Sequence, residues 1–577
     1  MRTQPRKPAP LKKLLRPYRT WLTALFVLTL LSNGLNLWIP QIISQGIDTF
    51  ASTSGVSPSI FWQFFWFMLL IFALGVAQGI LQSLLSEKVA FHLRRDMAEK
   101  ISRQPYAYIE EVSSAKLMTH MTADVDAVKS YIAMAVVAMN SAYLIIGGSA
   151  LLLLWTNWGL AFAVLTIVPL IAATFMVIFK QLGPLFRKTR ENMDALGAVI
   201  SESILGAALV RVLHVEKQEQ EKFTVVNRIT KETGMRILHL FSAMIPLITF
   251  ISNGATIILL LFGGHLVIQG SMTLGQLSAF MSYVMLFIFP IISLGFLSNF
   301  AMQATASYNR ISEVLDAPEP PAHGGLQVVP KGSIAVRHLS LKKGDKQILK
   351  DISFAVEPGS KTAIVGPTAA GKTQLLQILC GLTAPTEGDV LYDDKPLSAY
   401  DPEYITQHIG FVFQDSVIFN TTLAENIGFQ TELSKEAAQK ALSTAELSAF
   451  IEQLPEGVNT MVSERGASLS GGQKQRLMLA RALAQNPKIL MLDDFTARVD
   501  GPTQARILAN LHTNYPDVTI INITQNIASV LEYDQILVLM EGELLGIGTH
   551  EGLLTSCPEY AQMYTSQQST HHYELHA

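Results

Sequence analysis

The chain has 577 residues, of which 49% are hydrophobic and only 15% are charged, and its net charge is −3. This length excludes a single ordinary domain, which holds about 50–250 residues. Soluble domains carry about 25% charged residues, so the composition also excludes a wholly soluble protein, and nothing in the charge indicates nucleic-acid binding.

Four stretches without Asp, Glu, Lys or Arg divide the first half of the chain, at 20–47, 51–86, 130–179 and 237–309. A helix crosses the hydrocarbon core with about 20 apolar residues. The first two stretches therefore fit one crossing each, and the longer two fit two each, with turns at 156–158 and 270–273. We expect a transmembrane domain over 1–314 with six spans, at 20–47, 58–85, 131–155, 159–180, 240–268 and 274–305.

Lysine and arginine collect on one side of this topology. Seven precede residue 21 and many more lie in 87–129 and 180–236, whereas the turns at 156–158 and 270–273 contain none. Because positive charge marks cytoplasmic segments, both termini are predicted to lie in the cytoplasm of a cell whose inner (cytoplasmic) membrane holds the protein. A signal peptide would also have a basic start, but this apolar run is long and five more spans follow.

Prolines and glycines at 315–333 mark a linker, and a second domain is expected at 334–577. Short β-branched runs at 361–365, 409–413, 489–492 and 518–523 alternate there with helical segments. This rhythm is typical of an α/β domain with a largely parallel sheet. The predicted fold class is therefore multidomain, with an all-α six-helix transmembrane domain, long cytoplasmic helical extensions and a C-terminal α/β domain.

A phosphate-binding loop follows the first of these runs. It has the pattern G-x-x-x-x-G-K-[ST], which opens a helix continuing from Gln374. Its residues are Gly366, Pro367, Thr368, Ala369, Ala370, Gly371, Lys372 and Thr373. Backbone N–H groups and the helix N-terminus attract phosphate, Lys372 reaches the outer phosphates and Thr373 holds magnesium, so ATP with Mg²⁺ is the expected ligand.

The apolar run 489–492 ends in Asp493 and resembles the Walker B strand of P-loop ATPases. A strand that delivers a carboxylate beside the phosphate loop suits magnesium coordination, so Asp493 is predicted as a metal ligand.

Between these two motifs lies a pentapeptide that resembles the signature of the ATP-binding cassette (ABC) family. It consists of Leu469, Ser470, Gly471, Gly472 and Gln473. Together with the two motifs above, it identifies the chain as a member of the exporter-type half-transporters, whose ATP domain is a P-loop ATPase. The resemblance implies a dimer in which the signature contacts ATP bound to the partner. It also implies that Gln414 is the Q-loop glutamine near magnesium, that 497–500 is the D-loop, and that 108–128 and 202–213 are coupling regions.

Four positions depart from the family pattern. Asp494 replaces the glutamate that acts as general base, and Gln525 replaces the switch histidine. No aromatic residue for adenine stacking occurs in 339–344, where Lys343 is the nearest candidate, and Ala369 replaces a common glycine. Losing a general base costs about 10²- to 10⁴-fold in rate, so hydrolysis at this site is expected to be slow.

These departures predict the degenerate-site subunit of a heterodimeric exporter of amphipathic small molecules, drugs or lipids. The expected partners are a second ABC half-transporter, membrane lipid and the substrate, without nucleic acid. Two alternatives remain. One is a regulatory or nucleotide-gated subunit that binds ATP without turnover, and the other is a homodimer in which Asp494 still works as a slow base.

Overall fold

The computed structural model describes residues 11–53, 55, 58–319, 324–415, 417–429, 434–463, 466, 468–496 and 498–574. They form two compact units. Of the described residues, those within 11–103 and 113–317 form the helical unit, and those within 104–112 and 318–574 form the α/β unit. The predicted fold class, a six-helix transmembrane domain followed by an α/β domain, is confirmed. Residues 320–323 of the predicted linker lie outside the described residues.

Among the described residues, six continuous helical stretches are long and apolar enough to cross a membrane. They are Lys13–Ser52, Pro58–Ser102, Ser114–Thr156, Trp158–Leu205, Glu216–Ile268 and Leu274–Leu315. Each has 40 to 53 residues. At 1.5 Å per residue such a helix is about 60–80 Å long, roughly twice the hydrocarbon core. Each helix therefore projects beyond the membrane, because Lys, Arg, Glu and Gln continue a helix as readily as apolar residues do.

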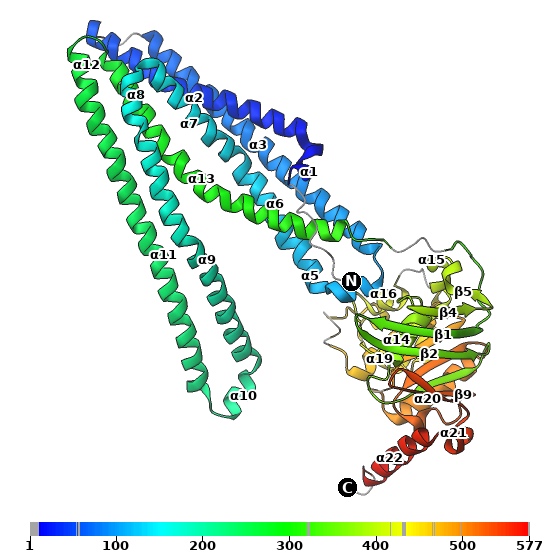
Figure 1. Ribbon diagram of the computed structural model, residues 1–577. Coiled ribbons are helices and arrows are strands. Elements are labelled where there is room, and N and C mark those ends of the chain that lie inside the picture. The colour runs from blue at the N-terminus through cyan, green and yellow to red at the C-terminus, as the bar shows by residue number, and fades with distance from the viewer. Residues whose placement is uncertain are drawn as a thin grey trace. The chain divides into compact units, whose positions relative to one another are not determined.

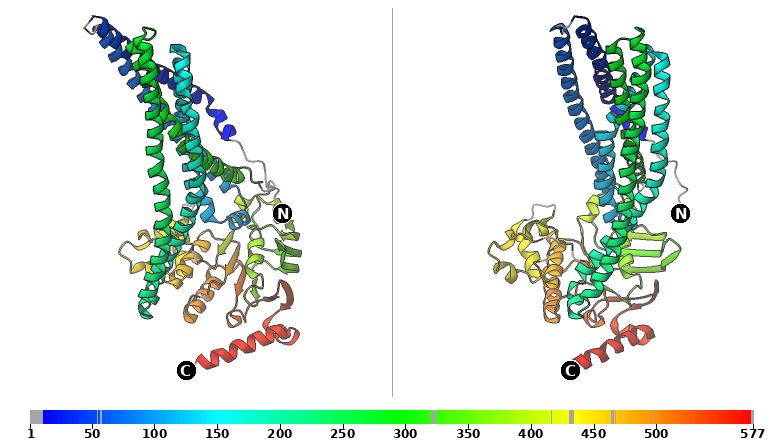
Figure 2. Two further views of the ribbon diagram at one scale, coloured as in Figure 1. Left: turned by 60° about the vertical axis from the view of Figure 1, so that its left-hand side comes forward. Right: turned by 90° about the vertical axis from the view of Figure 1, so that its left-hand side faces the viewer.

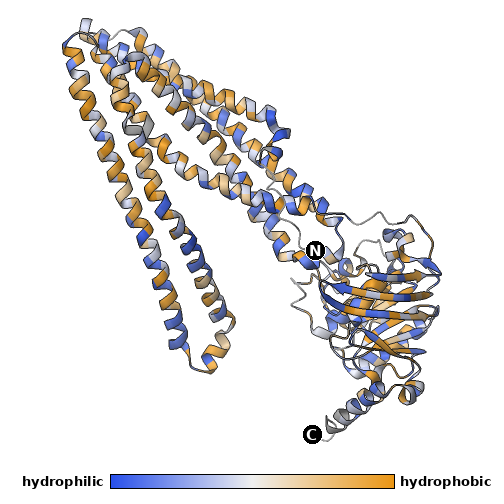
Figure 3. Ribbon diagram, viewed as in Figure 1, coloured by the Kyte–Doolittle hydropathy of each residue, from blue (hydrophilic) through white to orange (hydrophobic). Residues whose placement is uncertain are grey.

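Two groups of helices make up the helical unit (Figure 1). In one, α2, α3, α7 and α13 pack together, and in the other α9 packs along α11, with α10 at their common end. Figure 3 shows that α9 and α11 become hydrophilic toward α10. The bounds are α1 Leu11–Leu15, α2 Arg19–Thr53, α3 Pro58–Ser102, α5 Ser114–Thr119, α6 Val125–Ser130, α7 Val137–Thr156, α8 Trp158–Leu165, α9 Ile167–Leu205, α10 Ala207–Val212, α11 Glu216–Ile258, α12 Gly264–Ile268 and α13 Leu274–Leu315.

The turns of this unit carry conventional caps. Asn157 accepts from the N–H of Leu160 and begins α8, and Thr273 forms a capping box with Gln276 at the start of α13. The carboxylate of Asp48, near the end of α2, also caps α13, accepting from the N–H of Gly275 at 2.8 Å. These side chains satisfy the free N–H groups of the first helical turn.

The α/β unit is built on two sheets. The larger has the strand order β10-β9-β3-β8-β7-β6 and is parallel except for β10. The predicted parallel sheet is this one. The smaller sheet, β2-β1-β4-β5, is antiparallel and was not anticipated. The bounds are β1 Ile334–Lys343, β2 Lys346–Val356, β3 Lys361–Val365, β4 Glu387–Tyr392, β5 Lys395–Pro396, β6 Ile409–Val412, β7 Ile489–Asp493, β8 Thr519–Thr524, β9 Gln535–Met540 and β10 Glu543–Gly548.

The helices of the α/β unit cover the larger sheet and form separate hydrophobic clusters with it. The last helix, α22, projects from the unit (Figure 2). The bounds are α4 Tyr106–Val112, α14 Lys372–Leu379, α15 Pro402–Thr406, α16 Leu423–Gly428, α17 Lys435–Thr444, α18 Ser448–Glu452, α19 Gly471–Ala484, α20 Gly501–Asn514, α21 His550–Ser556 and α22 Pro558–Glu574.

Candidate functional site

The phosphate loop lies between β3, which ends at Val365, and α14, which begins at Lys372. Two of its glycines are sterically required. Gly366 has φ of 155°, and a Cβ there would lie 2.0 Å from the carbonyl oxygen of Leu539. Gly371 has φ of 97°, where a side chain would be strained. The loop therefore closes tightly enough for its backbone N–H groups to surround an anion.

Lys372 folds back over this loop. Its Nζ donates to the carbonyl oxygens of Gly366 and Pro367, each at 2.8 Å. Burial lowers the pKa of Lys372, and the neighbouring carboxylates of Asp494 and Asp493 oppose that shift. The ammonium group is thus placed at the phosphate loop by weak neutral partners, which a phosphate can displace because a charge-assisted hydrogen bond is stronger.

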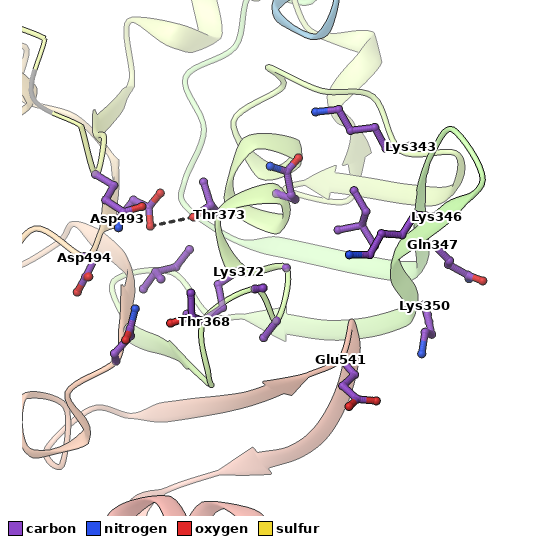
Figure 4. Close-up of a pocket in the computed structure, with 18 residues that line it drawn as sticks. Lys343, Lys346, Gln347, Lys350, Thr368, Lys372, Thr373, Asp493, Asp494 and Glu541 are labelled. Carbon is purple, nitrogen blue, oxygen red and sulfur yellow. Dashed lines mark hydrogen bonds between the residues drawn. The ribbon is translucent and has the colours of Figure 1, made fainter. Parts of the chain in front are cut away.

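Asp493 ends the buried strand β7 and faces the first turn of α14. Its Oδ1 accepts from the hydroxyl of Thr373 at 3.3 Å (Figure 4). Burial raises the pKa of Asp493, and Thr373 partly offsets that shift. A carboxyl group and a hydroxyl group from two elements 120 residues apart therefore present oxygen atoms to one point, as magnesium prefers.

Asp494 follows directly and has an unusual backbone conformation. Its φ is 47°, in the left-handed region that aspartate tolerates better than most residues. Its N–H donates to the carbonyl oxygen of Ile523 at 2.9 Å, which ties it to strand β8. Burial also raises the pKa of Asp494, whereas Lys372 lowers it.

A cavity of about 550 Å³ joins these groups. Its wall contains most of the residues that the sequence singled out: Thr368, Ala369, Ala370, Gly371, Lys372, Thr373, Gln374, Gln414, Asp493, Asp494 and Gln525. The remaining wall is Lys343, Lys346, Gln347, Ile348, Lys350, Ile523 and Glu541. None of these described wall residues is aromatic. Lys343, Lys346 and Lys350 lie on one side of the cavity and the two aspartates on the other, with Lys372 between them (Figure 4).

Lys343, the residue nearest to the expected adenine position, has a different partner. Its Nζ lies 2.8 Å from Oε2 of Glu110 in α4, a helix that belongs to the same unit. Both side chains are about half exposed, so the pair contributes less than about 1 kcal/mol. This links the first predicted coupling region to the cavity wall. Farther along that region, Asp124 is instead buried in the helical unit and accepts from Ser307 and Arg310.

The signature residues do not line this cavity. Ser470 is the N-cap of α19 and forms a capping box with Gln473: the N–H of Gln473 donates to Oγ of Ser470 at 3.3 Å, and the N–H of Ser470 donates to Oε1 of Gln473 at 2.7 Å. A Cβ at Gly472 would lie 2.9 Å from the carbonyl oxygen of Arg498. Ser470, at the start of this helix, is exposed. Of the predicted D-loop, Ala497 lies outside the described residues.

Comparison with known proteins agrees with this geometry. Residues 22–291 match the family model of the ABC transporter transmembrane region, and residues 349–497 match a second family model, described as ABC transporter. An ABC transporter ATP-binding protein of Bacillus subtilis is 30% identical over 559 residues, covering 96% of this chain and 97% of the relative. The chain belongs to the ABC transporter family.

Two further similarities refine the kind of ABC transporter. A multidrug resistance ABC transporter ATP-binding and permease protein of Lactococcus lactis is 30% identical over 503 residues, covering 86% of this chain and 85% of the relative. The solved structure of a bacterial Atm1-family ABC exporter with ATP bound has the same fold, with a TM-score of 0.77, 24% identity and coverage of 95% and 98%. This ABC transporter therefore has the fold of that exporter, and its α/β unit is an ATPase coupled to transport.

Two functional candidates in this ABC transporter escaped the sequence reasoning. Gln475 donates from Nε2 to the carbonyl oxygen of Gln414 at 3.0 Å and so joins the signature helix to the cavity. Gln567 contacts the backbone of Gln525 from the far end of the chain. Gln475 follows the signature by two residues, and that proximity was the available signal. Gln567 has no such signal, because its contact joins residues 42 apart in the sequence.

Proposed function

We propose that this chain is one half of a heterodimeric exporter of amphipathic small molecules, drugs or lipids, and that its own ATP site turns over slowly. The observation that carries this proposal is the composition of one cavity. An intact phosphate loop lies there together with Asp494 and Gln525, at the two positions where the family places its general base and switch histidine.

Binding of ATP with Mg²⁺ is supported by the groups in the cavity. Asp493 and Asp494 both line the cavity with raised pKa values, and Asp493 accepts from the hydroxyl of Thr373. This oxygen-rich set suits a hard divalent cation. We assign Thr373, Gln414 and Asp493 to the magnesium ion and the loop from Gly366 to Gln374 to the phosphates. Bound magnesium neutralises part of the phosphate charge.

Slow turnover follows from the chemistry of the two substituted side chains. Asp494 is one methylene shorter than glutamate, and a general base must come within about 2.6–3.2 Å of the proton that it accepts. Its left-handed backbone, held by the hydrogen bond to Ile523, restricts a compensating shift. Gln525 donates a hydrogen bond to phosphate but carries no positive charge. Binding is thus retained while proton abstraction is weakened.

The signature favours a second, active site formed with a partner. Ser470, Gly471 and Gly472 place small side chains at the N-terminus of α19, which suits an anion. We assign Leu469–Gln473 to ATP bound by the partner. The partner is then a half-transporter with glutamate after its Walker B aspartate and a switch histidine.

The helical unit supports an amphipathic cargo. Five phenylalanines from α9, α11 and α13 form a continuous aromatic ladder: Phe175, Phe179, Phe186, Phe241 and Phe296. Phe186 at one end and Phe296 in the middle remain 48% and 42% exposed, whereas Phe175 at the other end is buried. Apart from Lys180 at the end of the fourth, the predicted spans contain no Asp, Glu, Lys or Arg. The multidrug function named for the Lactococcus relative agrees with such an apolar, aromatic surface. We place the α/β unit and both termini on the cytoplasmic side of the inner membrane.

The test uses inverted membrane vesicles that hold this chain alone, or with a half-transporter that carries the glutamate and the histidine. ATP turnover and efflux of an amphipathic dye are measured. We expect turnover and efflux only with the partner. Both should be retained in Asp494→Asn and lost in Ser470→Arg, while the control Ser443→Arg, at an exposed position of α17, should behave as wild type.

Brisk turnover by this chain alone, abolished by Asp494→Asn, would contradict the proposal and identify a homodimer with a working aspartate. A functional partner that lacks both the glutamate and the histidine would also contradict it. ATP-dependent conformational change without turnover in any combination would instead identify a regulatory subunit.

A further inference from the structure

The C-terminal helix α22 is hydrogen bonded to the loop that carries Gln525. The side-chain amide of Gln567 donates from Nε2 to the carbonyl oxygen of Gln525 at 2.7 Å. The same amide accepts at Oε1 from the N–H of Ile527 at 3.0 Å. One side chain therefore makes two backbone hydrogen bonds, as a neighbouring β-strand would, and holds the two peptide groups that follow Gln525.

The part of α22 before Gln567 is firmly anchored. Tyr560 is fully buried, and its hydroxyl lies 2.8 Å from Nδ1 of His550 in α21. Tyr560 packs in a hydrophobic cluster with Ile527 and with Val365, the last residue before the phosphate loop. The helix thus rests on the strand that leads into the nucleotide site, and this packing sets the position of Gln567 one and a half to two turns farther along.

The held loop is part of the nucleotide cavity. Strand β8 ends at Thr524, and the next residue, Gln525, lines the same cavity as Asp494 and Lys372. Gln567 itself is not among the described residues that line the cavity. Any effect of Gln567 on nucleotide therefore passes through the backbone that directs the side chain of Gln525.

We propose that Gln567 is a positioning residue for the nucleotide site and that α22 sets how long a nucleotide stays bound there. The two hydrogen bonds fix the backbone that follows Gln525 and so direct its side chain toward the terminal phosphate. Its amide is therefore preorganised to donate a hydrogen bond to the phosphate. This inference needs only the nucleotide site of this chain. It holds whether the partner is a second copy or a different half-transporter.

The experiment measures nucleotide retention on this chain in the assembled, full-length transporter. Radiolabelled 8-azido-ATP is bound and chased with excess unlabelled ATP for increasing times. The remaining label is then cross-linked by light and the chains are separated by electrophoresis. Gln567→Leu removes both hydrogen bonds, Gln567→Glu keeps only the acceptor, and Gln568→Leu is the matched control. Gln568 lies next to Gln567 on the same helix and bonds only to Tyr564 among the contacts described for its side chain.

We expect Gln567→Leu to shorten the half-life of the bound nucleotide about 3- to 10-fold, which is the scale for losing ordinary hydrogen bonds, and Gln567→Glu to shorten it less. Gln568→Leu should leave it unchanged. An unchanged half-life in Gln567→Leu, or an equal loss in Gln568→Leu, would overturn the proposal. If Gln567→Leu does not accumulate, Gln567→Glu decides, because its side chain has the same length and an unchanged half-life there also overturns the proposal.

Discussion

Ala369 is the residue of the phosphate loop whose replacement by glycine should stabilise the protein. Its φ is 64°, in the left-handed region, although it carries a Cβ. That conformation costs an L-residue about 1–2 kcal/mol. Glycine removes this cost but adds about 0.5–1 kcal/mol of backbone entropy to the unfolded chain. Ala369→Gly should therefore increase the free energy of unfolding of the α/β unit by about 0.5–1 kcal/mol.

The neighbouring alanine provides the control. Ala370 does not have a positive φ, is 3% exposed and packs in the hydrophobic core, so Ala370→Gly loses packing and relieves no strain. The assay follows labelled-ATP binding by the full-length chain after heating. For a unit of this size we expect a midpoint about 1–4 °C higher for Ala369→Gly and a lower midpoint for Ala370→Gly. A lower midpoint for Ala369→Gly would refute the strain argument.

Two further predictions concern the same cavity. Because burial raises the pKa of Asp493 and Asp494 in the folded unit, the folded state binds more protons than the unfolded state just above the ordinary carboxyl pKa. In the absence of metal, the stability that these groups contribute should therefore be full at low pH and be lost as pH rises through their folded pKa values. Calorimetry in EDTA measures how the free energy of unfolding changes with pH, and this dependence should be weaker in Asp493→Asn. Separately, Lys343→Tyr should tighten ATP binding about 5- to 160-fold, since a ring stacked on a base contributes about 1–3 kcal/mol. Lys343→Leu breaks the same exposed ion pair without adding a ring, so it should change the affinity little in equilibrium binding.

The sequence predicts the parts of the site that depend on local pattern. The loop from Gly366 to Thr373 is recognisable because its glycines, lysine and threonine all lie within one short, continuous segment of the sequence. Asp493 is recognisable because it directly follows a run of apolar residues that forms a buried strand. Both lie in the cavity, on the elements that were expected.

The parts that depend on distant residues were not predictable in this way. The antiparallel sheet escaped because irregular pairing between Val336 and Leu339 breaks the two-residue alternation that reveals a strand. The pair of Lys343 with Glu110 and the contacts of Gln567 join residues far apart in the chain, and neither leaves a motif. The long helical extensions were predictable, because a helix continues through the charged residues that mark the membrane boundary.

The most direct test of the central claim restores the two substituted positions. Asp494→Glu with Gln525→His is expressed alone, and phosphate release is measured beside the wild-type chain and a triple variant that adds Lys372→Ala. A dimer of this variant contains two intact phosphate loops and two intact signatures. We therefore expect that its turnover is at least about tenfold higher than that of the wild-type chain and is abolished by Lys372→Ala. Turnover equal to or below that of the wild-type chain would contradict the claim that Asp494 and Gln525 limit hydrolysis at this site.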